Sequence, residues 1–264
     1  KKFGVDSLTG NWDYRESALF GYAAGRVIES FYKFNLESSD KVVAQFHEWM
    51  TGTGLLYLKS VNVPIATVFT THATVIGRCI AGNYLPLYDG IHGYDADEKA
   101  RHFNVVARHS LEKKAAQYSD IFTTVSDITA QECRQFLGRP VDVVTPNGFE
   151  PSFTPATDEE FEALRENSRT KLMSVASAMC GEEISENEVL IGIGGRYEWK
   201  NKGIDVFIDA LDKINRNEEY KGKKVHAFIM IPSGHNGPDK QLLAKLSGNG
   251  STYVTRTSHY LMNA

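Results

Sequence analysis

The chain has 264 residues, a formal net charge of −4 and 42% hydrophobic residues, enough to bury the core of one large domain or two smaller ones. The near-neutral charge gives no reason to expect a nucleic acid or an anionic membrane as partner, and no run approaches the roughly 20 apolar residues of a membrane span. The three widely spaced cysteines form neither a disulfide framework nor a CxxC metal site. We therefore expect a soluble, cytoplasmic protein.

Short apolar, β-branched runs alternate along the chain with longer segments of helical period. The predicted strands are 41–46, 64–71, 120–126, 141–147, 189–195 and 225–231. The predicted helices are 16–34, 54–60, 100–117, 128–137, 159–178 and 204–215. Because continuous hydrophobic strands alternate with helices, the pattern predicts an α/β fold with a parallel sheet that helices cover on both faces.

The alternation breaks once, after the fourth predicted strand. The segment GFEPSFTPATDEE has two prolines and no apolar period, and a long polar helix follows it. We interpret residues 1–150 as a first α/β domain, 151–186 as a helical connection and 187–264 as the start of a second domain. The second domain has only two convincing strands and the first begins on a loop, so we expect the chain to be part of a longer polypeptide.

Polar residues follow the first two predicted strands, at the edge where parallel α/β sheets bind ligands. His47 and Glu48 follow the first strand, and His72 follows the second with Arg78 six residues on. If a helix begins directly after His72, its free amide groups favour an anion, which His72 and Arg78 can contact. The alternative for each is structural: a polar pair that satisfies local backbone groups, and a histidine at a strand–helix junction. A zinc site is not indicated, because Thr51 occupies the second histidine position of HExxH.

The fifth predicted strand ends in GIGGRYEWKNKG. Tyr197 occupies the place of the third glycine in GxGxxG, and GxxxxGK[ST] does not occur, so this is neither a standard dinucleotide fingerprint nor an NTPase loop. Arg196 directly follows a run predicted to be buried, and Lys202 lies six residues later, before a helix. The two cations can hold a diphosphate from both sides of a turn. The alternative is a solvated, charged loop.

Five stretches, in order from Val42 to Leu211, resemble the eukaryote-type glycogen synthases. They are VVAQFHEW, PIATVFTTHATVIGR, DIFTTVSDITAQE, VDVVTPNGF and GGRYEWKNKGIDVFIDAL. The resemblance implies a retaining glycosyltransferase with two Rossmann-like domains that face each other across a cleft, the GT-B arrangement, of which this chain holds the second domain incompletely. We expect a bacterial member of the family.

The resemblance also implies a reaction: transfer of glucose, with retained configuration, from a nucleotide diphosphate glucose to the non-reducing end of an α-1,4-glucan such as glycogen. UDP-glucose is favoured over ADP-glucose as the donor. By resemblance, Arg196 and Lys202 bind the donor diphosphate and offset the charge that develops as it leaves, and His72 lies beside the donor sugar. The substrate-binding set is completed by Arg78, Glu48, His47, Tyr197 and Asn201.

The resemblance implies that no metal or separate cofactor takes part and that the protein is a homo-oligomer. Because of the near-neutral charge, neither nucleic acid nor membrane is expected as a partner. The family's glycine-rich loop, its acidic motif with an essential carboxylate and its arginine-rich regulatory helix are not in this sequence, so we expect the chain alone to be inactive and the parent protein to be the enzyme. The alternatives are a non-catalytic module that binds a sugar nucleotide or a glucan, and another enzyme of the same two-domain plan, such as a sugar-nucleotide epimerase.

Overall fold

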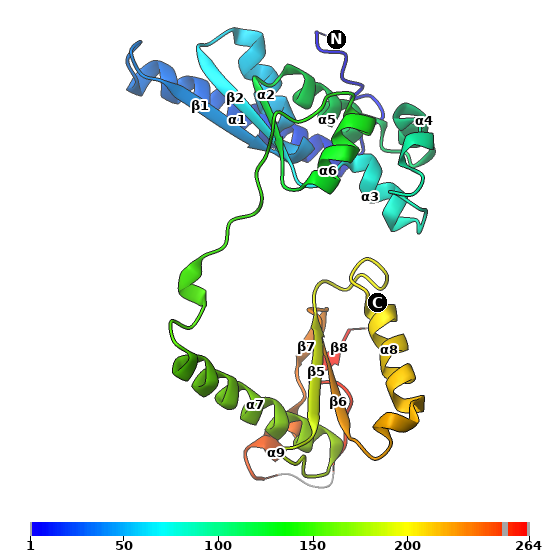
Figure 1. The fold of residues 1–264 in the computed structure, drawn as a ribbon. Helices are drawn as coiled ribbons and strands as arrows, with labels where there is room; N and C mark the ends of the chain where they lie inside the picture. The colour runs from blue at the N-terminus through cyan, green and yellow to red at the C-terminus, as the bar shows by residue number, and fades with distance from the viewer. Residues whose placement is uncertain (1, 250–252, 263–264) are drawn as a thin grey trace. The chain divides into compact units, whose positions relative to one another are not determined.

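The computed structural model describes residues 2–249 and 253–262. The chain forms two compact units, Lys1–Phe149 and Glu150–Ala264, and each is described by itself (Figure 1). Both contain parallel strands connected through helices, which confirms the predicted α/β fold. Within the described ranges, no helix has the length and apolar character that crossing a membrane requires.

The first unit is built on a sheet of four parallel strands in the order β1-β2-β3-β4. These strands are β1 (Val42–His47), β2 (Ile65–Thr71), β3 (Ile121–Thr124) and β4 (Val143–Val144). The helices of this unit are α1 (Trp12–Asn35), α2 (Glu48–Val61), α3 (Val75–Gly82), α4 (Ala96–His102), α5 (Val106–Tyr118) and α6 (Asp127–Glu132), with a 3₁₀ turn at Ile91–Gly93 and a π-helical turn at Cys133–Leu137. In register, Phe46 of β1 lies beside Phe69 of β2, which lies beside Phe122 of β3. These buried rings belong to the main hydrophobic core of the first unit, which thus includes residues near the ends of β1 and β2.

Glycines bring α1 and α2 into backbone contact. A Cβ atom on Gly25 would lie 2.8 Å from the carbonyl oxygen of Gly54, and one on Gly54 would lie 2.5 Å from that of Gly21. On its other side α2 packs against α5, where a Cβ atom on Gly52 would meet Leu111 at 3.2 Å. Because α2 starts directly at the end of β1, this close packing also fixes the residues at that strand end.

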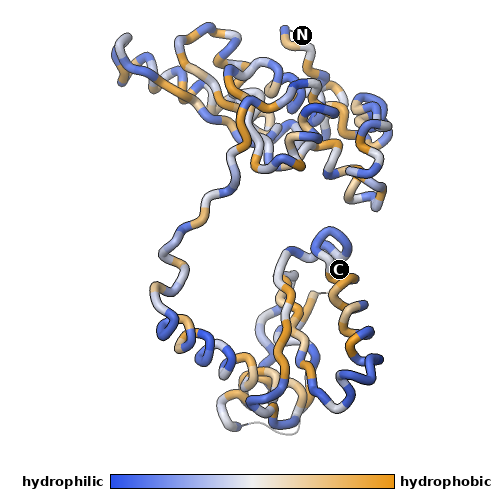
Figure 2. Tube along the Cα trace, in the orientation of Figure 1, coloured by the Kyte–Doolittle hydropathy of each residue, from blue (hydrophilic) through white to orange (hydrophobic). Residues whose placement is uncertain are grey.

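The second unit begins with a turn at Pro151–Phe153 and the long helix α7 (Asp158–Cys180). Two parallel strands follow, β5 (Val189–Gly194) and β6 (Val225–Met230), connected through α8 (Ile204–Arg216) and a 3₁₀ turn at Glu218–Tyr220. An antiparallel pair, β7 (His235–Pro238) and β8 (His259–Leu261), and the short α9 (Lys240–Leu246) complete it. Figure 2 shows hydrophobic residues along β5 and along one side of α8.

Three predicted helix boundaries differ from the structure. The helix α1 starts at Trp12 rather than residue 16, because the side chain of Asn11 accepts from the backbone N–H of Tyr14 and caps it. The helix α2 starts at Glu48, six residues before the predicted start. The predicted helix 100–117 is two helices, α4 and α5, separated at Asn104, whose φ of 56° is incompatible with a continuing helix.

The predicted strand 141–147 pairs only over Val143–Val144, and β7, β8 and α9 were not predicted. The β7 segment, HNGP, has no β-branched or alternating pattern, and it is held by pairing with β8 more than 20 residues later in the chain. Helix α3 was expected only conditionally; it begins at Val75, with Thr74 as its N-cap.

Candidate active site

The ends of β1 and β2 bring four of the predicted residues together. Nδ1 of His47 and Nε2 of His72 are joined by a hydrogen bond of 3.1 Å. The backbone N–H of His72 donates to Oε1 of Glu48 over 2.9 Å, and Nη2 of Arg78 lies 3.9 Å from the same oxygen. We call His47, Glu48, His72 and Arg78 the strand-end cluster. It combines two imidazoles, a carboxylate and a guanidinium at the carboxyl edge of the sheet, where parallel α/β folds bind ligands.

Glu48 is held in an unusual backbone conformation. Its φ is 63°, in the left-handed region, and it follows β1 without an intervening loop. That conformation costs a residue with a side chain about 1–2 kcal/mol. It persists here because the turn directs the carboxylate to the backbone N–H of His72, while the hydroxyl of Thr51 donates to the carbonyl of His47 over 2.7 Å. Backbone strain of this kind is concentrated at functional positions.

The start of α3 differs from what the sequence suggested. The N–H of Val75 donates to Oε2 of Glu112 over 2.9 Å, and the N–H of Gly77 donates to the hydroxyl of Thr74 over 3.0 Å. The N–H of Thr74 points to Oε2 of Glu132 at 3.4 Å. These amide groups are occupied by protein side chains, so recognition of an anion beside α3 depends on side chains such as Arg78.

Sequence reasoning missed the two carboxyl groups beneath this helix. Glu112 of α5 is 0% exposed and Glu132 of α6 is 4% exposed. Burial raises the pKa of Glu112 to about 8, and the nearby charges of Glu48 and Glu132 act in the same direction. Hydrogen bonds that Val75 and Thr71 can donate to the ionised form offset part of this rise. The available signal was the position of Glu112, which directly follows Leu111 and lies three residues before Ala115 on the apolar side of a helix.

In the second unit, the other predicted residues lie on the loop between β5 and α8. Nε of Arg196 lies 3.2 Å from Oε1 of Glu198, and the side chain of Arg196 is 67% exposed. The loop is closed by hydrogen bonds from the N–H of Glu198 to the carbonyl of Arg196 and from the N–H of Lys202 to the carbonyl of Glu198. It ends at Gly203, which has a φ of 68° and directly precedes the first residue of α8. Tyr197 and Asn201 are exposed on the same loop.

The stem of Lys202 packs over the start of this loop. A Cβ atom on Gly195 would lie 3.6 Å from Cγ and Cδ of Lys202, an ordinary van der Waals distance. The loop therefore carries Arg196 and Lys202 on a turn that directly follows the carboxyl end of a parallel strand. The roles assigned to these residues stay predictions.

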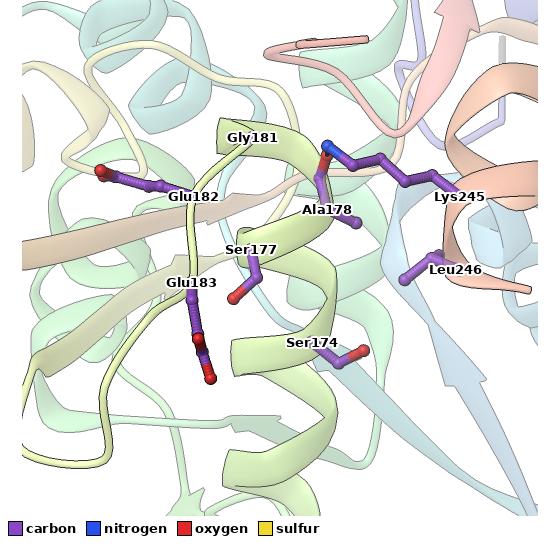
Figure 3. Close-up of a pocket in the computed structure, with 8 residues that line it drawn as sticks. All are labelled: Ser174, Ser177, Ala178, Gly181, Glu182, Glu183, Lys245 and Leu246. Carbon is purple, nitrogen blue, oxygen red and sulfur yellow. Dashed lines mark hydrogen bonds between the residues drawn. The ribbon is translucent and has the colours of Figure 1, made fainter. Parts of the chain in front are cut away.

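A pocket of about 380 Å³ in the second unit lies elsewhere, between the end of α7 and α9 (Figure 3). The ammonium of Lys245 donates to the carbonyls of Ala178 and Tyr253, and the hydroxyl of Ser177 accepts from the N–H of Ile184. These polar groups stabilise the end of α7, which lies near the amino end of β5. The loop that carries Arg196 and Lys202, here called the cationic loop, follows the carboxyl end of β5. Among residues 2–249 and 253–262, no group of three or more His, Cys, Asp or Glu side chains is placed to hold a metal ion.

Comparison with known proteins relates the chain to one family. The family model described as "Glycogen synthase" matches residues 4–244. Glycogen [starch] synthase of Dictyostelium discoideum is 36% identical over 234 residues, which are 86% of this chain and 26% of that protein. Isoform 2 of Saccharomyces cerevisiae is 34% identical over 240 residues, 88% of this chain and 34% of the yeast protein. The mouse liver enzyme is 37% identical over 177 residues, 66% of this chain and 25% of that protein.

The matched region thus spans only about a quarter to a third of the length of these relatives. All three are eukaryotic, and a bacterial source for this chain stays a prediction.

Proposed function

The chain belongs to the glycogen synthase family, and we propose that the protein is a glycosyltransferase that extends an α-1,4-glucan. It transfers glucose, with retained configuration, from a nucleotide diphosphate glucose to the non-reducing end of the acceptor. The main support is the family match over residues 4–244, which includes both the strand-end cluster and the cationic loop. The proposal includes two Rossmann-like domains of the GT-B arrangement, UDP-glucose as the preferred donor, a cytoplasmic location and a homo-oligomer.

Arg196 and Lys202 are proposed to bind the donor diphosphate. When the bond between glucose and phosphate breaks, negative charge develops on the leaving oxygen, and cations directed at it lower the barrier. The exposed guanidinium of Arg196 can form two parallel hydrogen bonds to phosphate oxygens, whereas Lys202 supplies a point charge. Protein cations thus supply the charge in this proposal, which does not require a metal.

The strand-end cluster is proposed to bind the sugar and the acceptor side of the reaction. His72 lies beside the donor sugar and Arg78 meets a phosphate. Glu48 fixes the main chain at His72 through the N–H bond of 2.9 Å and keeps Arg78 within 3.9 Å, while His47 fixes the ring of His72. Tyr197 and Asn201 support the cations of the other unit. This assignment gives each predicted polar residue a substrate or a neighbour to act on.

The test is glucose transfer to glycogen by the full-length protein, with UDP-glucose or ADP-glucose as donor and a chelator present. We expect transfer from UDP-glucose with an α-1,4 product and little transfer from ADP-glucose. A faster reaction with ADP-glucose would overturn the donor assignment alone. Absence of transfer from both donors, in a protein shown to be folded, would overturn the proposed function.

A further inference from the structure

Two buried carboxyl groups lie behind the strand-end cluster, and their surroundings differ. Glu112 comes from α5 and Glu132 from α6, yet both contact the first residues of α3. Neither is exposed enough to meet a substrate. Their hydrogen-bond partners differ, and this difference favours a proton on only one of the two.

Glu132 accepts hydrogen bonds only. The hydroxyl of Thr74 accepts from the N–H of Gly77 and therefore directs its own proton to Oε2 of Glu132, 2.7 Å away. The N–H of Thr74 points to the same oxygen. The hydroxyl of Tyr88 donates to Oε1 over 2.8 Å, and burial together with this bond raises the pKa of Tyr88, so the phenol keeps its proton. A carboxylate without a proton satisfies all three donors.

The groups around Glu112 offer too few protons to pair every acceptor if Glu112 is ionised. Its Oε2 accepts from the N–H of Val75. Its Oε1 lies 3.1 Å from the hydroxyl of Thr71, and that hydroxyl also lies 3.3 Å from the carbonyl of Ala73. One hydroxyl proton cannot serve both acceptors. If Oε1 carries a proton, Glu112 donates to Thr71 and Thr71 donates to Ala73, so every group in the chain is paired.

The charges around Glu112 also oppose its ionisation. Glu48 from α2 and Glu132 from α6 are both negative neighbours. The thiols of Cys133 and Cys79 face the same region, and burial raises the pKa of each, so both stay neutral; Arg108 partly offsets this at Cys79. Burial is the largest cause that holds the pKa of Glu112 near 8. An isolated carboxylate here would carry a large desolvation cost.

We propose that Glu112 is a neutral carboxylic acid that positions the turn from β2 to α3, and that loss of its proton in alkaline solution weakens binding of the nucleotide sugar at the strand-end cluster. The inference rests on the proposed function. Thr71 and Val75, which Glu112 holds, flank His72 on both sides. When Glu112 ionises, it loses the proton that it donates to Thr71, so the hydroxyl proton of Thr71 can pair with Glu112 or with Ala73 but not with both. A negative charge also appears at the start of α3, the helix that carries Arg78. Glu112 is a positioning residue, since it touches no substrate.

The sign and size of the pH effect follow from the protonation state. Glu112 is neutral below about pH 8 and ionised above it. If only the neutral form binds well, the competent fraction at pH 9 is about one tenth, so the apparent KM rises about tenfold.

The stability of the fold should also depend on the protonation of Glu112. Between the two pKa values, Glu112 holds a proton in the folded state that it has lost in the unfolded state. Folding therefore weakens as pH rises from the ordinary glutamate range, about 4.3, to about 8, by up to tenfold in the folding equilibrium per pH unit.

The matched variant is Glu112→Gln, which cannot ionise. Its amide can donate to Thr71 and its carbonyl can accept from Val75. We expect the ratio of the wild-type KM for UDP-glucose to that of the variant to be about one at pH 7, and to rise about tenfold by pH 9 with a midpoint near 8. The same ratio at both pH values would overturn the proposal.

A second measurement does not depend on activity. Infrared difference spectra, wild type minus Glu112→Gln, should contain a carboxylic-acid carbonyl band at pH 7. This band should be lost as the pH rises, with a midpoint near 8. Its absence at pH 7 would overturn the assignment of Glu112, even if the protein transfers glucose. Conversely, the band together with no glucose transfer would uphold the protonation state and overturn the proposed function with its consequence for KM.

Discussion

The contact between α1 and α2 gives a test of how the first unit holds its strand ends. In Gly54→Ala, the new Cβ atom would lie 2.5 Å from the carbonyl oxygen of Gly21 and 2.8 Å from Cε1 of Phe46. Phe46 is 3% exposed and lies within the core, and the carbonyl belongs to the backbone of α1. Neither neighbour can move aside alone, so the two helices must separate.

Two effects of opposite sign determine the result. Alanine favours a helix interior over glycine by about 1 kcal/mol. Forcing an extra methyl group into a close-packed interior typically costs about 1–3 kcal/mol. Both short contacts are with rigid groups, which places this cost at about 2–3 kcal/mol, and the net destabilisation at about 1–2 kcal/mol. That corresponds to a factor of about 5–30 in the equilibrium between the packed helices and the opened form from which the α2 amides exchange.

The assay is hydrogen exchange of the full-length protein, read by mass spectrometry on peptides from α1 and α2. We expect exchange of the α2 amides to become about 5–30 times faster in Gly54→Ala. The matched control is Gly82→Ala at the end of α3, where a new Cβ atom meets nothing within 4 Å, so exchange should be unchanged or slower. If Gly54→Ala protects α2 as well as the wild type does, the glycine contact does not hold the helices.

Three further predictions use other parts of the chain. Arg196→Ala should lower turnover in glucose transfer by a factor of about 10²–10³, more than it raises KM, because the lost charge acts on the leaving diphosphate; equal turnover would exclude that role. Glu132→Gln should lower the unfolding free energy by about 1–3 kcal/mol in denaturant titration, because the amide group that replaces one oxygen would face the donor of either Thr74 or Tyr88; an unchanged midpoint would contradict the hydrogen-bond directions. Cys133 is fully buried and its pKa is raised by burial, so it should resist alkylation in the native protein while the partly exposed Cys180 reacts; equal rates would contradict this burial.

The sequence predicted the elements whose signal is local. The predicted strands 41–46 and 225–231 correspond to Val42–His47 and Val225–Met230, because short runs rich in apolar and β-branched residues favour strands. The start of α2 was missed because no capping residue marks it. Glu48 begins the helix in a left-handed conformation, and the bond that fixes its carboxylate goes to His72, on another strand. A contact between residues so far apart in the chain has no local sequence signal.

Part of the candidate site was predictable for a related reason. Polar residues directly after a buried strand are unusual, so His47, Glu48 and His72 were found by position, and the structure brings them into contact. Glu112 was not found, because the lysines that follow it are typical of a solvated helix face. Its burial depends on the packing of α3 across α5. The sequence did not firmly predict α3 as a helix.

The hydrogen bonds at the start of α3 also determine which groups can recognise an anion there. A helix start normally offers free N–H groups and a positive dipole end to an anion. Here Glu132 and Glu112 accept from the amides of Thr74 and Val75, and the negative charge of Glu132 offsets the positive end of the helix dipole. The first unit therefore cannot bind a diphosphate through this helix as a dinucleotide fold does. Positive charge beside α3 must therefore come from side chains such as Arg78.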